Sequence, residues 1–197
     1  MEYQNFRNHL SKILGVPIDS LEFCSSFYEV KQAKKNEIIL REGEISDCTF
    51  FVEKGLLRMY SIDKVGKEHV IQFAPENWII SETTSQLLNE KSRFYIEAIE
   101  ESTIIVTREG FFEDLSKIYP DVAEKNQRLM FNHIKNLQNR VNALISTTAE
   151  ERYLEFLKKY PNLMLRAPQW MVASYLGITP ESSSRVRKEL AKKKFEI

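Results

Sequence analysis

The chain has 197 residues, of which 43% are hydrophobic and 28% charged, a composition typical of a globular protein with a substantial core. The formal net charge is zero because 28 Lys and Arg balance 28 Asp and Glu. No apolar run reaches the roughly 20 residues of a membrane-spanning helix. Two cysteines, Cys24 and Cys48, are too few for a disulfide framework, so we expect a cytoplasmic protein.

Two short helices are predicted at the amino terminus. Over 2–14, apolar residues recur every three or four positions, which indicates an amphipathic helix. A second helix is predicted from Asp19, with Glu22 three residues later as its capping-box partner. Neither helix carries residues that suggest chemistry, and His9 is expected at the surface.

Short runs rich in branched and aromatic residues occupy 34–107, where glycine and charged turns separate them. Runs of this length at regular spacing are typical of an antiparallel sandwich or barrel. We therefore predict a small β-roll with its own core. The predicted strands are 37–40, 49–52, 56–61, 67–73, 78–80, 92–99 and 103–107.

One long helix is predicted over 121–146, a segment without glycine or proline that follows a short helix over 108–119. Its apolar residues are separated by four, three, four and three positions, the spacing of a coiled-coil seam. Such a helix is roughly 39 Å long, more than one small domain would cover, so we predict a dimer interface. The alternative is that this face packs on the chain's own β-roll. The seam residues are Met130, Ile134, Leu137, Val141 and Leu144.

The carboxyl-terminal part of the chain is basic. From Glu151 onward there are ten Lys and Arg against five Asp and Glu, a net charge of +5, which suits contact with an anionic polymer. Thr148 and Glu151 predict a capping box for a helix that ends at Pro161.

Two further short helices are predicted around a tight turn at Gly177, since glycine readily adopts the left-handed conformation that ends a helix. Pro168 is predicted at the first position of the earlier helix. Thr179 is predicted to cap the later helix, with Pro180 in its first turn. The small residue Ala173 is expected where the two helices approach most closely.

This arrangement matches a helix-turn-helix, whose second helix lies in the major groove of DNA. Arg185 is suited to bidentate hydrogen bonds with guanine, and Glu181 is suited to accept a hydrogen bond from a cytosine amine. The alternative is an ordinary helical hairpin with a solvated basic face. The predicted DNA-contacting residues are Gln169, Thr179, Glu181, Ser182, Ser184, Arg185 and Lys188.

A β-roll, a long dimer helix and a carboxyl-terminal helix-turn-helix, in that order, resemble the Crp/Fnr family of bacterial transcription regulators. The most specific stretch is 173–185. The resemblance implies an α+β fold: an antiparallel β-roll of the jelly-roll (double-stranded β-helix) type, a dimerisation helix and a winged-helix-like helix-turn-helix. The expected domains are a sensor (1–120), the dimerisation helix (121–147) and the DNA-binding domain (148–197). The implied partners are a second copy of the chain, palindromic double-stranded promoter DNA and RNA polymerase.

The chain departs from the family pattern in two places near its end. Ser183 lies where such a motif normally has an aliphatic residue under the turn, so its hydroxyl either weakens the small core or bonds a backbone acceptor. The sequence stops at Ile197, so much of the β-hairpin wing that follows the second helix in many relatives is expected to be missing.

In relatives that bind cyclic nucleotides, a Gly-Glu pair opens a short helix and an Arg-Ser pair follows. Here Ser81 replaces the glycine, so Glu82 would match the carboxylate that binds the ribose. Ser92 and Arg93 stand in reversed order. Neighbouring strand residues point to opposite faces, so a shift of one position turns the guanidinium away from a phosphate. The candidate effector residues are therefore Glu82, Ser92 and Arg93, but a cyclic nucleotide is disfavoured against another small molecule or no ligand.

Catalysis is not expected. A metal-dependent oxygenase needs clustered His and carboxylate ligands, yet only His69 lies in the strand region. The chain has no phosphate loop and no serine elbow, and an iron–sulfur cluster needs four cysteines. We predict no cofactor or metal site and a homodimeric DNA-binding transcription regulator whose β-roll acts as a sensor. The alternative is a small-molecule-binding or protein-interaction module without DNA binding.

Overall fold

The computed structural model describes residues 3–17 and 28–195, with side chains up to Lys192 at the carboxyl end. The chain forms two compact units. Unit 1 comprises Met1–Ser61 and Gln72–His133, and unit 2 comprises Ile62–Ile71 and Ile134–Ile197. The division proposed at residues 120 and 147 stays a prediction. None of the described helices is long and apolar enough to cross a membrane.

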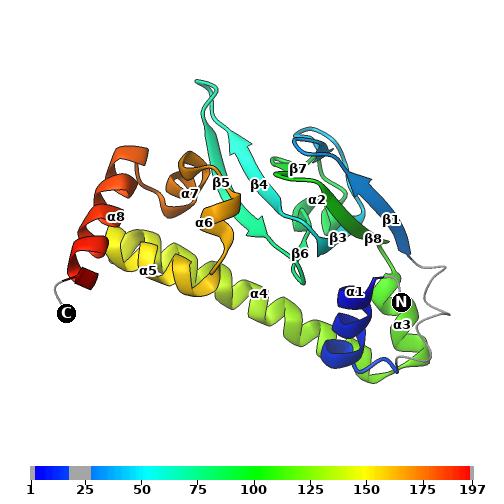
Figure 1. Ribbon diagram of the computed structural model, residues 1–197. Coiled ribbons are helices and arrows are strands. Elements are labelled where there is room, and N and C mark those ends of the chain that lie inside the picture. The colour runs from blue at the N-terminus through cyan, green and yellow to red at the C-terminus, as the bar shows by residue number, and fades with distance from the viewer. Residues whose placement is uncertain (1–2, 18–27, 196–197) are drawn as a thin grey trace. The chain divides into compact units, whose positions relative to one another are not determined.

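Within the described residues, eight strands form two four-stranded sheets, and every strand pair with a described register is antiparallel. The sheet orders are β1-β8-β3-β6 and β2-β7-β4-β5, so neighbouring strands are mostly distant in sequence, as in a jelly roll (Figure 1). The strands are β1 (Tyr28–Ala33), β2 (Ile38–Leu40), β3 (Cys48–Lys54), β4 (Leu57–Ile62), β5 (Glu68–Ala74), β6 (Ile79–Ile80), β7 (Tyr95–Ala98) and β8 (Ser102–Arg108).

The helices follow the predicted order, and the α+β fold with a β-roll, a long helix and carboxyl-terminal helices is confirmed. Nothing after β8 in the described part of the chain is a strand. The helices are α1 (Gln4–His9), the π-helical η1 (Leu10–Leu14), α2 (Thr83–Leu88), α3 (Phe111–Ile118), α4 (Asp121–Ser146), α5 (Ala149–Lys159), α6 (Leu163–Arg166), α7 (Gln169–Leu176) and α8 (Pro180–Phe195).

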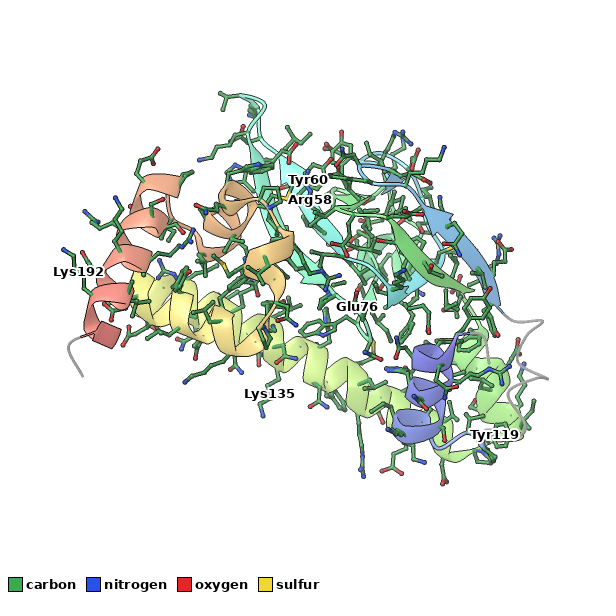
Figure 2. All side chains as sticks on the ribbon, in the orientation of Figure 1. Arg58, Tyr60, Glu76, Tyr119, Lys135 and Lys192 are labelled. Atoms are coloured by element: carbon green, nitrogen blue, oxygen red, sulfur yellow. The ribbon has the colours of Figure 1, made fainter. Side chains whose placement is uncertain are left out.

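A buried ion pair lies on the sheet β2-β7-β4-β5. Arg58 on β4 is directly opposite Glu97 on β7, and its Nε and Nη2 donate to Glu97 Oε2 at 2.8 and 2.5 Å. The Arg58 guanidinium also lies 4.0 Å from the ring centroid of Tyr60 (Figure 2). Tyr60 in turn stacks on Tyr95. Arg58 and Glu97 are 3% and 8% exposed, so each charge needs the other to be tolerated at this depth.

The helices at the amino-terminal end of unit 1 share a hydrophobic cluster with β3 and β8. Glu53, near the end of β3, fixes α1 in this cluster because its carboxylate accepts the N–H groups of Asn5 and Phe6 at 2.9 and 2.8 Å. A carboxylate at this point satisfies free amides at the helix start and complements the helix dipole. The cluster consists of Phe6, Leu10, Leu14, Val16, Phe51, Ile105, Phe111, Leu115 and Val122.

Several local expectations need correction. Strand β1 was missed because its residues are polar and half exposed; it lies at the edge of its sheet beside β8. Helix α6 was also missed, and Pro168 is the residue before α7 rather than its first. His9 is half buried and not fully at the surface: its Nε2 is buried and has no hydrogen-bond partner among the described residues, and burial lowers its pKa. The helix predicted from Asp19, like Cys24, lies outside the described residues.

Candidate nucleic-acid interface

Unit 2 contains the two helices of the predicted helix-turn-helix, α7 and α8 (Figure 1). Helix α7 is buried along most of its length, with Val172 and Ala173 fully inaccessible. The burial of Ala173 is consistent with the close approach expected there, which stays a prediction. On α8, Val186 is 7% exposed and Ser183 is 4% exposed, so Ser183 is buried as an aliphatic residue at this position would be.

The turn between α7 and α8 is fixed by Gly177. Its φ of 67° is the left-handed conformation predicted for this position. The amide of Gly177 donates to the Ser174 carbonyl and that of Ile178 to the Ala173 carbonyl, both at 3.0 Å. A Cβ at residue 177 would lie 2.9 Å from Leu144 Cδ2, so the turn also packs closely against the last seam residue of α4.

Thr179 caps α8 as predicted. Its Oγ1 accepts the Ser182 amide at 3.2 Å, and Pro180 is the first residue of the helix. The Glu181 carboxylate in the first turn has a pKa below its usual range because it accepts hydrogen bonds from its own backbone and from Thr179. Glu181 is thus held ionised at the positive end of the helix dipole.

Aromatic side chains support α7 from the side of α5. Three aromatic rings lie with their centroids 5.1 to 5.9 Å apart: those of Phe156 on α5, Tyr160 just after α5, and Tyr175 on α7. All three are nearly buried, and burial raises the pKa of Tyr160 well above its usual range. Helix α5 begins with the predicted capping box, in which Thr148 and Glu151 bond each other's backbone amides. Helix α7 therefore packs through Tyr175 against buried aromatic side chains of α5 and the residue that follows it.

The outward side of α8 is polar and basic. Arg185 and Lys188 are exposed and three positions apart, so they lie on one face of the helix. Neither takes part in an ion pair within the described residues. Lys192, four positions further, projects from the outer side of α8 in Figure 2. The predicted DNA-contacting residues Gln169, Thr179, Glu181, Ser184, Arg185 and Lys188 are all exposed, and Ser182 is half exposed.

The five predicted seam residues lie along one stripe of α4 and remain between 40% and 56% exposed. Phe131 and Ile145, beside the stripe, are 60% and 80% exposed. The stripe is thus an apolar surface that the described part of the chain leaves about half exposed. A contiguous group of large apolar side chains that is exposed to solvent marks an interaction surface.

Comparisons with known proteins agree with this geometry. Residues 30–119 match the model of the cyclic nucleotide-binding domain. The "Anaerobic regulatory protein" of Pasteurella multocida is 24% identical over 173 residues, which cover 82% of this chain and 63% of the relative. The "Transcriptional activator protein anr" of Pseudomonas aeruginosa is 28% identical over 167 residues, 78% of this chain and 66% of that protein. The chain therefore spans slightly less than two thirds of each of these two relatives.

Among solved structures, FixK2 from Bradyrhizobium japonicum has a TM-score of 0.73 at 21% identity, and the match covers 84% of this chain and 85% of the FixK2 chain. The catabolite activator protein of Thermus thermophilus has a TM-score of 0.56 at 17% identity, over 91% of this chain and 85% of that one. The chain is therefore similar to the Crp/Fnr regulators in sequence and in fold. At these identities the structural matches show the shared fold.

Two of the three candidate effector residues, Glu82 and Ser92, make hydrogen bonds within the β-roll. The Glu82 carboxylate is 5% exposed and accepts the amides of Thr84 and Ser85 at 3.3 and 2.6 Å, so it caps α2. Ser92 is 2% exposed, and its hydroxyl bonds the amide and carbonyl of Phe94. Arg93 is exposed. The first amides of α2 are therefore satisfied by a carboxylate of the chain itself.

Two further features of unit 2 could not be predicted from the sequence. The hairpin tip 62–71 belongs to unit 2, where the Ser174 hydroxyl accepts the Val70 amide at 2.9 Å and donates to the Glu68 carbonyl at 3.2 Å. Arg140 and Arg152 bind the carboxyl end of α7. No local sequence signal marks these contacts, because each joins residues at least 24 positions apart.

Proposed function

We propose that this protein is a homodimeric transcription regulator of the Crp/Fnr type that binds palindromic promoter DNA in a sequence-specific manner. The observation that carries the proposal is the exposed polar and basic face of α8, on a helix-turn-helix whose opposite face is buried. The relatives described as an anaerobic regulatory protein and as a transcriptional activator support it. RNA polymerase as a partner and a cytoplasmic location belong to the same proposal, and we propose no catalytic activity.

Reading of bases is assigned to the amino-terminal half of α8. Arg185 has five guanidinium donors and no ion pair within the described residues, so it is suited to the O6 and N7 acceptors of guanine. Glu181 is ionised and exposed, and it accepts from the amine of cytosine. Ser184, between them on the same face, contacts either base.

Contacts with the phosphates are assigned to the positions around this reading face. Gln169 lies at the exposed start of α7, and Thr179 and Ser182 lie at the start of α8, where the helix dipole favours an anion. Lys188 and Lys192 lie further along α8 and are exposed. Phosphate contacts of this kind fix the register of the protein on the duplex without reading its sequence.

The dimer is assigned to the stripe of α4. Ile134 and Val141 are branched at Cβ and occupy the first apolar position of successive heptads, while Leu137 and Leu144 occupy the second. This choice favours two parallel strands over three or four. In a parallel pair the two α8 helices leave the dimer at the same end. A helix-turn-helix dimer then reads two half-sites about one DNA turn, or ~34 Å, apart.

We propose that the β-roll works without a cyclic nucleotide. A cyclic phosphate needs free amides and a guanidinium, but the first amides of α2 already bind the Glu82 carboxylate and Arg93 is exposed. Addition of cyclic AMP or cyclic GMP should therefore leave the melting temperature unchanged. A stabilisation that grows with nucleotide concentration would show that the roll binds it.

The DNA-binding proposal is tested by selection of a duplex from a random pool, followed by affinity measurements at several salt concentrations. Binding should weaken steeply as salt rises because Lys and Arg release counterions from the phosphates. Arg185→Ala should cost about 1 to 3 kcal/mol and relax selectivity at one base pair. Lys192→Ala is the matched control, because loss of a phosphate contact weakens all sequences alike.

The competing proposal is a small-molecule-binding or protein-interaction module without DNA binding. Affinity that is absent, or that does not depend on salt, would favour this module over a regulator. Equal losses on the selected and on random duplexes for Arg185→Ala would remove Arg185 from the reading role.

A further inference from the structure

The carboxyl end of α7 leaves four carbonyl groups that no amide of the same helix can bond, those of residues 173–176. Two of them are satisfied by the turn that follows, since Ile178 donates to the Ala173 carbonyl and Gly177 to the Ser174 carbonyl. The remaining two, those of Tyr175 and Leu176, need donors from elsewhere in unit 2.

Two arginines supply these donors. Arg140 on α4 donates from Nη2 to the Tyr175 carbonyl at 2.9 Å, and its guanidinium lies 3.7 Å from the centroid of the Tyr175 ring. Arg152 on α5 donates from Nε to the Leu176 carbonyl at 2.9 Å. Positive charge at this point also complements the negative end of the α7 dipole. Every carbonyl of the last turn of α7 is thereby bonded.

Arg152 binds a second helix end at the same time. Its Nη1 donates to the carbonyls of Thr147 and Ala143, the latter at 3.4 Å, where α4 ends. One planar guanidinium therefore joins the carboxyl ends of α4 and α7. Because the nitrogens of a guanidinium are fixed relative to one another, this bridge sets a direction between the two helices as well as a distance.

The two helices joined in this way have different tasks in the proposed function. Helix α4 carries the dimer seam, and α7 packs on α8, which carries the reading face. The turn that links α7 to α8 rests on Leu144, the last residue of the seam. Any change in the angle between α4 and α7 therefore moves α8 relative to the seam.

We propose that Arg140 and Arg152 are positioning residues that set the angle of the DNA-reading helices to the dimer helix, and thereby the half-site spacing that the dimer accepts. This inference rests on the proposed function. Neither arginine reads a base, because their guanidinium groups bond carbonyl groups of the chain. They fix geometry and do not add contacts with DNA.

The variant Arg152→Lys tests the proposal. It keeps the charge, but a single ammonium group cannot donate at the same time, and in a fixed geometry, to the carbonyls at the ends of α4 and α7. Arg128→Lys is the matched control: Arg128 is an exposed arginine on α4 whose partner is Glu124 on the same helix, 2.6 Å away. Circular dichroism and thermal melting establish that each variant is folded.

The measurement is the affinity for the selected operator and for versions with one base pair added or removed between the half-sites. One base pair shifts a half-site by about 3.4 Å and rotates it by roughly a tenth of a turn. Wild type and Arg128→Lys should lose about tenfold in affinity on the altered spacings, or about 1.4 kcal/mol. Arg152→Lys should reduce this loss to about twofold, while its affinity for a single half-site stays as in wild type. An unchanged spacing penalty in Arg152→Lys would overturn the proposal.

A second measurement decides the proposal without DNA. Spin labels at Lys135→Cys on α4 and Glu189→Cys on α8, in a chain with Cys24→Ser and Cys48→Ser, report the distance between two exposed sites of unit 2. Dilution with unlabelled protein isolates the distance within one chain. The distribution should broaden in Arg152→Lys and not in Arg128→Lys. Equal widths would refute positioning, whereas a wild type that selects no duplex would refute the proposed function alone.

Discussion

Leu137→Glu should abolish the dimer and leave the protomer folded. Leu137 lies in the middle of the α4 stripe and is 43% exposed in the protomer, so the substitution creates no cavity in a core. The five seam residues are each 40% to 56% exposed. Burial of half of a large apolar side chain contributes roughly 1 kcal/mol, and ten such halves in a dimer contribute about 10 kcal/mol.

That gain is comparable to the cost of association, about 4 to 15 kcal/mol, so a single unfavourable position decides the outcome. Each substituted chain would lose about 1 kcal/mol of apolar burial at this position. Each would also place an unpaired carboxylate against that of the other chain, at a cost of at least about 1 kcal/mol. Over two chains the loss is about 4 kcal/mol or more, which raises the dimer Kd at least about a thousandfold.

Sedimentation velocity over a range of concentrations measures this change. Wild type should sediment at twice the chain mass of 23.2 kDa, and Leu137→Glu at the chain mass. Lys135→Glu places the same carboxylate on another face of α4 and should leave the dimer intact (Figure 2 shows Lys135). A Leu137→Glu protein that remains dimeric at the concentrations where wild type is dimeric would refute the assignment of the seam.

Three further outcomes are expected. Glu53→Gln should lower the free energy of unfolding by about 1 kcal/mol in urea titrations, because the carboxylate that binds the first amides of α1 is lost. Hydrogen bonds from Thr148 hold the Glu151 pKa below its ordinary value of 4.5, so the stability that Glu151 adds is present above pH 4.5 and lost as the pH falls through the lowered pKa. Burial raises the pKa of Cys48 to about 11, so in a Cys24→Ser chain iodoacetamide should alkylate it at least about tenfold more slowly than free cysteine at neutral pH.

Each of these outcomes has a control. Glu42→Gln changes an exposed carboxylate and should leave the unfolding free energy unchanged. In Glu151→Gln the difference from wild type should be seen at neutral pH and vanish in acid; a difference that grows in acid would contradict the capping role. Alkylation of Cys48 at the rate of free cysteine would show that its thiol is not shielded.

Periodicity and capping rules predicted much of this protein from local sequence. The bounds of α4, the capping box of Thr148 and Glu151, the left-handed Gly177 and the cap at Thr179 all depend on residues within four positions of one another. The exposed residues of α8 follow from the same periodicity. Local signals of this kind survive because a helix satisfies its own backbone within one turn.

Other features were set by contacts between distant parts of the chain. Strand β1 is polar and half exposed, and it is a strand only because β8 offers it a partner 69 to 79 residues away in sequence. Arg58 lies in a strand where a charge is expected at the surface, yet Glu97 on a neighbouring strand makes its burial tolerable. The helix pattern predicted His9 at the surface, but its ring lies 5.1 Å from that of Phe51 and is half buried.

The sequence by itself therefore determined the order of the main elements, the bounds of α4 and the identity of the exposed face on α8. Only the tertiary structure decided that Arg58 pairs with Glu97 and that Arg140 and Arg152 bond the carbonyls at the end of α7. The physical reason is the range of the interaction. A polar side chain bonds an amide or carbonyl that lies within reach, and for residues far apart in sequence only the folded chain brings the two groups together.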